Sequence, residues 1–151
     1  MRVVLQRVHR ASVVVDGGTI AEIGRGYLLL VGVGRGDPAD EPERLAEKIV
    51  NLRLFADDQG KTNRSLGDVD GEVLVVSQFT LYADLRKGRR PSWADAEDPT
   101  VASERVEALA AALEARAVRV GRGVFGATME VELLNDGPFT LVLDGASLSS
   151  A

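Results

Sequence analysis

The sequence contains no cysteine and only one histidine, His9. The lack of cysteine excludes thiol chemistry, and the shortage of histidine excludes most metal sites. Without cysteine the chain has no thiol nucleophile, no disulfide and no cysteine-ligated zinc. Any Ser-His-Asp triad would have to use His9, which lies between two strand-like segments, where a structural histidine is the usual case. We therefore expect no cofactor and no metal, so any catalysis must use hydroxyls, carboxylates, main-chain groups or the substrate itself.

Long apolar runs are also missing from the sequence. No stretch of 18 or more apolar residues occurs, which predicts that nothing spans a membrane. The first residues, Met1–Arg7, lack the apolar stretch of a signal peptide and begin like a strand, so we expect a cytoplasmic protein. The length of 151 residues fits one domain, predicted over 1–144, with a frayed tail of small residues over 145–151.

An excess of positive charge is missing, since 23 acidic residues outnumber 18 basic ones, the net charge is −5 and the isoelectric point is about 4.9. This charge balance argues against binding of nucleic acid over a long stretch, which needs many Lys and Arg contacts to phosphate. It does not argue against local binding of the short end of a nucleic acid. The exception is Arg86–Arg90, with four positive charges in five residues, followed closely by Trp93. Such a segment can pair with phosphates and stack on a base, although a solvated loop is the more common outcome.

Hydrophobic periodicity predicts an α+β fold with a mixed sheet and two main helices. An apolar stripe of Leu45, Ile49 and Leu52 indicates a helix that Asp37 or Asp40 could cap, and a second helix is predicted over 99–116. Four strands fit into the first 34 residues. The predicted strands cover 2–8, 11–15, 20–23, 27–33, 53–56, 118–120, 124–134 and 139–143, and an apolar run over 72–81 enters a polar cluster at its end.

Polar side chains occupy the end of that apolar run, at Ser77, Gln78 and Thr80 on either side of Phe79. Hydroxyl and amide groups at a strand end often belong to a ligand site, because the strand positions them rigidly. Pairing of Ser and Thr across a sheet, with Phe79 in the core, is the competing interpretation. Spacing alone favours this structural interpretation.

Two further segments carry unusual patterns. Asn135–Pro138 is typical of a β-turn, and although a Gly-Pro bond can be cis, only about 5–6% of X-Pro bonds in folded proteins are. The glycines of Gly121–Met129 do not match a phosphate-binding loop or a dinucleotide fingerprint. Glycine beside Phe125 and Met129 suggests a backbone approached closely by a flat or apolar group, and a simple bulge with core aromatics explains the pattern equally well.

Taken together, these segments resemble the D-aminoacyl-tRNA deacylase (D-tyrosyl-tRNA deacylase) family over essentially the whole chain up to the tail. The two most specific elements are Ser77-Gln78-Phe79-Thr80 and Asn135-Asp136-Gly137-Pro138, in this order and at this chain length. The similarity also covers Leu5–Val8, Ala11–Val13, Leu81, Arg90–Ser92 and Gly123–Ala127. It implies a barrel-like mixed sheet with two helices.

The resemblance implies a homodimer that hydrolyses the ester joining a D-amino acid, or glycine on a non-cognate tRNA, to the 3′ end of tRNA. Gly137-Pro138, as a cis element, would reach into the partner's pocket and reject L side chains sterically. Arg7 would steady this element. Phe139 differs from the smaller residue that usually follows the proline. By the same resemblance Ser77, Gln78, Phe79 and Thr80 would line the reacting end, and Phe125 and Met129 the adenosine side.

Two mechanisms are compatible with the residues. Main-chain N–H groups near Phe79 and Thr80 are candidates for stabilising the tetrahedral oxyanion. Thr80 could act as the nucleophile, but no His or Lys is assignable as its base. Alternatively, the ribose hydroxyl of the substrate assists attack by water, and we prefer this mechanism.

Two other functions compete with this one. One is a non-catalytic module that binds the tRNA 3′ end or a nucleotide. The other is a different hydrolase that acts on an adenosine-linked ester.

Overall fold

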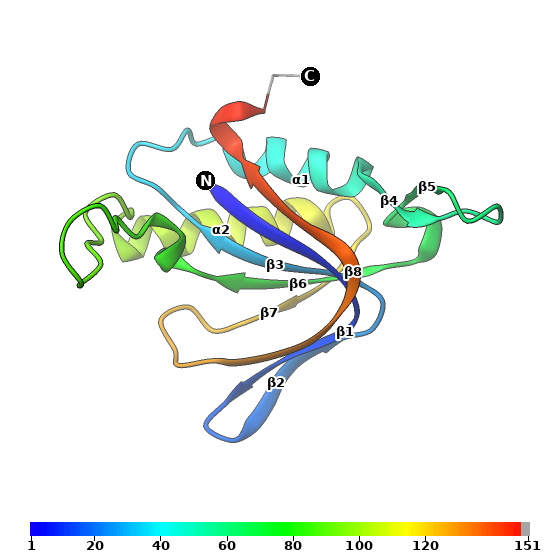
Figure 1. The fold of residues 1–151 in the computed structure, drawn as a ribbon, viewed down its shortest axis with the longest axis horizontal. Coiled ribbons are helices and arrows are strands. Elements are labelled where there is room, and N and C mark those ends of the chain that lie inside the picture. Colours follow the sequence, from blue (N-terminus) through cyan, green and yellow to red (C-terminus); the bar gives the residue numbers. More distant parts are fainter. Residues whose placement is uncertain (149–151) are drawn as a thin grey trace.

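The chain builds a curved, mixed β-sheet with two helices on one face (Figure 1). The structure is a computed structural model and describes residues 1–148. The sheet strands are β1 (Arg2–Val15), β2 (Gly18–Ile23), β3 (Gly26–Gly32), β6 (Glu72–Ser77), β7 (Arg119–Arg122) and β8 (Glu130–Asp144). The helices are α1 (Glu41–Asn51) and α2 (Pro99–Glu114). The α+β class with a mixed, barrel-like sheet and two main helices is therefore confirmed.

The curvature of the sheet comes from β1, which is one continuous strand. Its first half pairs antiparallel with β3, from Arg2 opposite Gly32, and its second half pairs with β2, from Ala11 opposite Ile23. The prediction of two strands over 2–8 and 11–15 was wrong, because β8 pairs along almost the whole length of β1 and holds it together. Strands β3, β6 and β7 are parallel to one another.

The C-terminal strand β8 is also continuous, so the predicted separation of two strands by a turn at 135–138 was wrong. The register with β1 shifts here, since Val8 lies opposite Asn135 whereas Gln6 lies opposite Thr140. The intervening residues form a bulge within the strand, and the turn-forming residue types are accommodated in it. The predicted strand over 124–134 begins only at Glu130.

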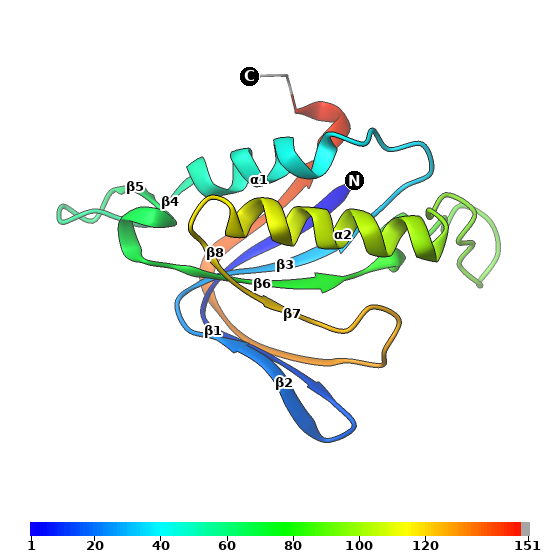
Figure 2. The same ribbon diagram turned by 180° about the vertical axis from the view of Figure 1, so that it is seen from behind.

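Both helices pack on the same face of the sheet (Figure 2). Leu45 and Ile49 of α1 and Leu109 and Leu113 of α2 are fully buried between the helices and the sheet. The predicted apolar stripe is thus confirmed as the packing face of α1. Asp40 occupies the N-cap position of α1, although its side chain makes no capping hydrogen bond.

Shorter elements complete the fold. A small hairpin pairs β4 (Arg53–Ala56) with β5 (Thr62–Ser65), and short 3₁₀ helices lie at η1 (Gly67–Val69), η2 (Phe79–Tyr82) and η3 (Gly145–Ser147). At η3, the first residues of the predicted tail, Gly145 is buried and its N–H donates to the Met1 carbonyl at 2.8 Å. Residues 149–151 of that predicted tail lie outside the described residues. None of the helices described is long and apolar enough to cross a membrane.

Candidate functional site

The parallel strands β3 and β6 end side by side, and the predicted reacting segment follows directly. Val31 of β3 lies opposite Ser77 of β6, and the Gln78 N–H donates to the Val31 carbonyl at 2.7 Å. In sheets covered by helices, ligands bind beyond the carboxyl ends of parallel strands. Figure 1 shows the loop that follows η2 at the end toward which β6 points. The fold therefore places Ser77–Thr80 at a position suited to binding.

A pocket of about 450 Å³ opens at these strand ends. Its lining is mainly apolar and aromatic, and the side chains come from β3, β6, α2 and the loops on either side. The residues that line it are Val31, Val33, Arg35, Ser77, Gln78, Phe79, Trp93, Ala96, Glu97, Asp98, Pro99, Ala102, Val106, Phe125 and Gly126. Four residues predicted for the site, Ser77, Gln78, Phe79 and Phe125, are thus brought together.

Exposed aromatic rings form part of this pocket's wall. Phe79 and Trp93 contact each other edge to face, with ring centroids 5.0 Å apart, and the exposed fractions are 54% for Phe79, 42% for Trp93 and 39% for Phe125. Large aromatic side chains exposed beside a pocket are typical of surfaces that pack against a flat ligand. The competing interpretation, which placed Phe79 in the core, is wrong.

Polar groups of the strand end face one another beside the pocket. The Gln78 Nε2 donates a hydrogen bond to the Thr80 Oγ1. As the first residues of η2, Phe79 and Thr80 have N–H groups without an intrahelical partner, and none of the hydrogen bonds found within residues 1–148 uses either group. Thr80 itself does not line the pocket. Two main-chain donors are therefore available next to the Gln78 side chain.

Arg35 and the two acidic residues of the pocket were missed by the sequence analysis. The Arg35 Nε donates to the Ala94 carbonyl at 2.7 Å, and its main-chain N–H donates to the Asp95 carbonyl at 3.0 Å. These bonds fix the segment that carries Trp93. Asp98 caps α2 by accepting from the Thr100 N–H at 3.0 Å. A lone charged residue after a strand gives no periodic signal, so nothing in the sequence marked Arg35.

A smaller cavity of about 130 Å³ adjoins the pocket and shares Ser77, Val106 and Phe125 with it. Met129, predicted on the adenosine side, lies behind Gly123, which lines this cavity. A Cβ at Gly123 would come within 2.7 Å of the Met129 sulfur, so the missing side chain is what allows Met129 to pack there. Met129 therefore supports the wall and does not line the main pocket.

The Gly137-Pro138 element lies in the β8 bulge and lines no part of this pocket. Its peptide bond is cis. The Arg7 Nε contacts both the Asp136 carboxylate, at 3.0 Å, and the Asp136 carbonyl, at 3.3 Å, and its guanidinium packs 4.4 Å from the centre of the Phe139 ring. Arg7 thus anchors the bulge from both sides of Gly137-Pro138.

Further polar groups lie around Arg7 and the β8 bulge. The Asn135 side-chain amide donates to the Arg7 carbonyl at 2.9 Å and to the Phe139 carbonyl at 3.2 Å, which ties together the two ends of the bulge. Burial raises the pKa of the Tyr27 hydroxyl, and the nearby Arg7 charge opposes part of this effect. His9 lies 3.7 Å from the Asp136 carboxylate, beside the bulge and not at the pocket.

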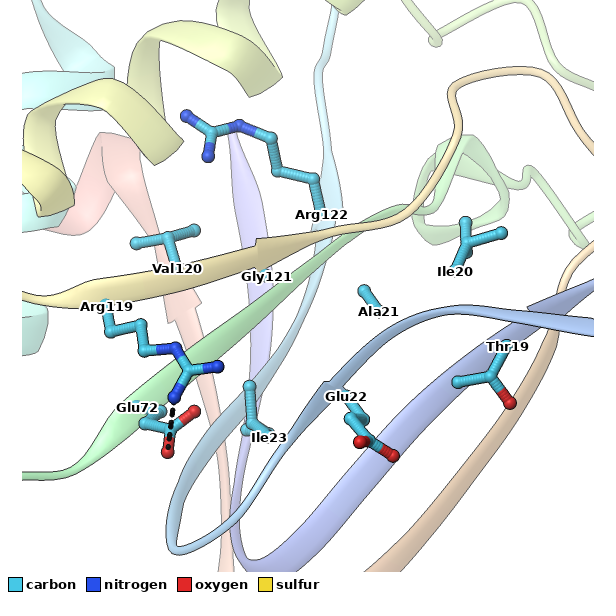
Figure 3. Close-up of a pocket in the computed structure, with 10 residues that line it drawn as sticks. All are labelled: Thr19, Ile20, Ala21, Glu22, Ile23, Glu72, Arg119, Val120, Gly121 and Arg122. Carbon is cyan, nitrogen blue, oxygen red and sulfur yellow. Dashed lines mark ion pairs between the residues drawn. The ribbon is translucent and has the colours of Figure 1, made fainter.

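A wider hollow of about 650 Å³ lies between the edge strands β2 and β7 (Figure 3). Arg119 and Glu72 approach each other there at 3.7 Å, and Gly121 lies close to Ala21. None of the predicted site residues lines this hollow. Within residues 1–148, no group of three or more acidic or histidine side chains is placed to hold a metal ion.

The fold and the pocket define a class of α+β proteins in which a curved mixed sheet presents a pocket of about 450 Å³ at its parallel strand ends. Residues 4–144 match the family described as D-Tyr-tRNA(Tyr) deacylase, and the chain belongs to this family.

Individual relatives agree with this assignment. A D-aminoacyl-tRNA deacylase of Roseiflexus castenholzii is 60% identical over 97% of this chain and 93% of its own length, and one of Chloroflexus aurantiacus is 58% identical over 98% and 92%. A solved structure titled "c-Myc DNA Unwinding Element Binding Protein" superimposes with a TM-score of 0.88 at 39% identity and covers 100% of both chains.

Proposed function

We propose that the chain hydrolyses the ester bond of D-aminoacyl-tRNA, and of glycyl-tRNA charged on a non-cognate tRNA, releasing free tRNA and the amino acid. The observation that carries this proposal is the family match over residues 4–144 together with the pocket at Ser77–Phe79. We also propose that the enzyme acts in the cytoplasm, where the substrate would be charged.

The terminal adenosine of tRNA is the part of the substrate that the pocket would hold. A volume of about 450 Å³ is in the range of small-ligand sites and suits a nucleoside. Phe79, Trp93 and Phe125 offer ring faces and edges to a base, since base–aromatic stacking contributes about 1–3 kcal/mol per base. The ester would then lie at Ser77 and Gln78, where the strand ends.

The chemistry would depend mainly on positioning. Water attacks the ester carbonyl carbon, the bond to the ribose 3′-oxygen breaks, and that oxygen takes a proton as it leaves. The N–H groups of Phe79 and Thr80 would stabilise the negative charge on the carbonyl oxygen in the transition state. The substrate's neighbouring 2′-hydroxyl would assist the attack, because within residues 1–148 the Thr80 hydroxyl is hydrogen-bonded only by the Gln78 amide, which is not a base, and His9 lies at the β8 bulge.

Chirality would be selected by the Gly137-Pro138 element of a partner subunit. This element does not line the pocket of its own chain, so we propose a homodimer in which each bulge enters the other protomer's pocket. Its carbonyl oxygens would meet the substrate's α-amino group and leave no space for an L side chain. Arg7 would act as the positioning residue through its contacts with Asp136.

Incubation with D-tyrosyl-tRNA tests the proposed activity against the competing one. We expect release of free D-tyrosine at a rate that rises in proportion to enzyme concentration. A non-catalytic module that binds the tRNA 3′ end would bind the same substrate without releasing the amino acid. Binding without release would overturn the proposal.

A further inference from the structure

The segment that joins η2 to α2 contains a closed, strongly basic loop. Asp84 and Ser92 pair through two main-chain hydrogen bonds, of 2.8 and 3.0 Å, so residues 85–91 form a loop with a fixed base. Gly88 near its tip has φ +70°, a conformation that side chains other than glycine rarely adopt. All residues from 85 to 91 are exposed. The basic loop, defined as residues 85–91, therefore projects from the protein and is closed at its base by the pairing of Asp84 with Ser92.

Three of the four cations in the basic loop have no acidic partner among the described residues 1–148. The Arg86 guanidinium makes two hydrogen bonds of 2.8 Å to the Asp84 carboxylate, which neutralises it and fixes it to the base of the loop. Within residues 1–148, Lys87, Arg89 and Arg90 take part in none of the ion pairs. Elsewhere Arg119 is paired with Glu72, whereas the exposed Arg25, Arg35 and Arg53 also take part in no ion pair within residues 1–148 but stand far apart in the sequence. The basic loop thus brings three unpaired cations together within four successive residues.

The basic loop is directly continuous with the wall of the pocket. Trp93 follows the closing residue Ser92 and lines the pocket, and Arg35 fixes the next residues through the carbonyls of Ala94 and Asp95. Figures 1 and 2 both show this loop beyond the N-terminal end of α2, the end that contributes Pro99 and Ala102 to the pocket. The three cations therefore lie on the pocket's side of the molecule.

We infer that Lys87, Arg89 and Arg90 bind the backbone phosphates of the RNA strand whose 3′-terminal nucleoside occupies the pocket. This inference rests on the proposed function. A terminal nucleoside is joined to the rest of its strand through its 5′-phosphate, so the chain of phosphates must leave the pocket past its rim. On a molecule with a net charge of −5, these three cations provide a local attraction that acts within about 10 Å at 0.1 M salt.

The inference is tested by comparing two esters that share the terminal D-tyrosyl adenosine, of which only one carries the rest of the RNA strand with its phosphates. The probes are D-tyrosyl-tRNA and the D-tyrosyl ester of adenosine, which contains no phosphate. The variant is Lys87→Gln with Arg89→Gln and Arg90→Gln, and the matched control is Lys48→Gln with Lys61→Gln and Arg119→Gln, three exposed cations on other surfaces.

We expect the loop variant to lose about 10- to 100-fold in kcat/KM on tRNA and to lose little on the adenosine ester. The slope of log(kcat/KM) on tRNA against log salt should become shallower by about 2, because each single-strand phosphate contact contributes about 0.7. The control variant should behave like the wild type. Equal losses on both esters, or no loss on tRNA, would overturn the inference.

A binding measurement separates this inference from the proposed function. If the wild type hydrolyses neither ester, the proposed activity fails, but uncharged tRNA with an intact 3′ end still reports phosphate contacts through fluorescence anisotropy. We expect the loop variant to bind uncharged tRNA at least tenfold more weakly than the control variant does. Equal affinities of the two variants would overturn the inference irrespective of hydrolysis.

Discussion

Thr80 is the residue at which the two possible mechanisms of ester hydrolysis differ. Its Oγ1 accepts a hydrogen bond from Gln78 and it does not line the pocket, which favours a positioning role. We predict that Thr80→Ala keeps the single-turnover rate on D-tyrosyl-tRNA within about tenfold of the wild type. Loss of an attacking nucleophile would cost far more, about 10⁶-fold in a well-studied serine enzyme. A loss above 1,000-fold would therefore contradict substrate assistance.

Asp84 is the residue that holds Arg86 at the base of the basic loop. Hydrogen bonds from the Arg86 side chain and main-chain N–H lower the pKa of the Asp84 carboxyl from 3.8 to about 2. We predict that Arg86→Gln returns this pKa toward its ordinary value, as followed by NMR titration of the carboxyl carbon. The control is Asp57, whose pKa is lowered mainly by the Lys61 main-chain N–H, and which should not change in this variant.

The sign of the accompanying stability change follows from the direction of the shift. A carboxyl with a lowered pKa in the folded protein contributes stability above its unfolded pKa, near 3.8, and loses it as pH falls through about 2. The difference in stability between wild type and Arg86→Gln should therefore be present at neutral pH and vanish below pH 2. A difference independent of pH would contradict this explanation.

At the scale of elements, the β8 bulge is where a small change should alter function without altering the fold. A Cβ at Gly137 would meet only the Asn135 Oδ1, at 3.7 Å, an ordinary contact. We predict that Gly137→Ala folds normally but loses about 10- to 100-fold in kcat/KM on D-tyrosyl-tRNA, because the added methyl group displaces the substrate's α-amino group.

A matched control for this variant is Gly18→Ala, in which the new Cβ would also meet one atom, the Val15 carbonyl oxygen, at 3.7 Å. Both variants should melt within a few degrees of the wild type. Full activity of Gly137→Ala would contradict a role of the bulge in the site. A large fall in melting temperature in Gly137→Ala alone would show that the bulge is mainly structural.

The elements differ in how far sequence could predict them. The helix over Glu41–Asn51 was predictable because Leu45 and Ile49 repeat at the helical period and face the core. The strand β5, Thr62–Ser65, was missed because its four polar residues show no alternation, and it exists through pairing with β4. In β8 local turn signals were outweighed by the ladder to β1, which no local pattern reveals.

The site was predictable only in part, for a similar reason. Periodicity marked Ser77–Thr80 as a polar strand end, but spacing alone favoured a structural role, and the resemblance to a family reversed that interpretation. Arg35, Ala102 and Val106 reach the pocket through tertiary packing of β3 and α2. Such residues have no local signal, because what they share is a cavity formed only after the elements assemble.

At the scale of the whole molecule, the proposed site would be completed by the partner subunit of the proposed homodimer. Gly137-Pro138 is exposed and lies away from its own pocket, on a strand that also exposes Leu134 and Val142, with exposed fractions of 45% and 73%. We predict a dimer by sedimentation velocity. Val142→Asp should weaken this dimer and the activity together, because an unpaired charge in an interface is costly.

Ile20→Asp is the control for that variant, since Ile20 is also exposed, at 42%, but lies on β2 beside the hollow of Figure 3. It should leave both the oligomeric state and the activity unchanged. A fully active monomer, of the wild type or of Val142→Asp, would contradict the contribution of a partner subunit.

The central claim, that the shape of this site admits D- and excludes L-aminoacyl esters, is tested most directly by one paired measurement. Deacylation of D-tyrosyl-tRNA and L-tyrosyl-tRNA is followed under identical conditions, with the spontaneous hydrolysis of each ester subtracted. We predict enzyme-dependent release from the D-ester and none above background from the L-ester. Equal enzyme-dependent rates, or no release from the D-ester, would contradict the claim.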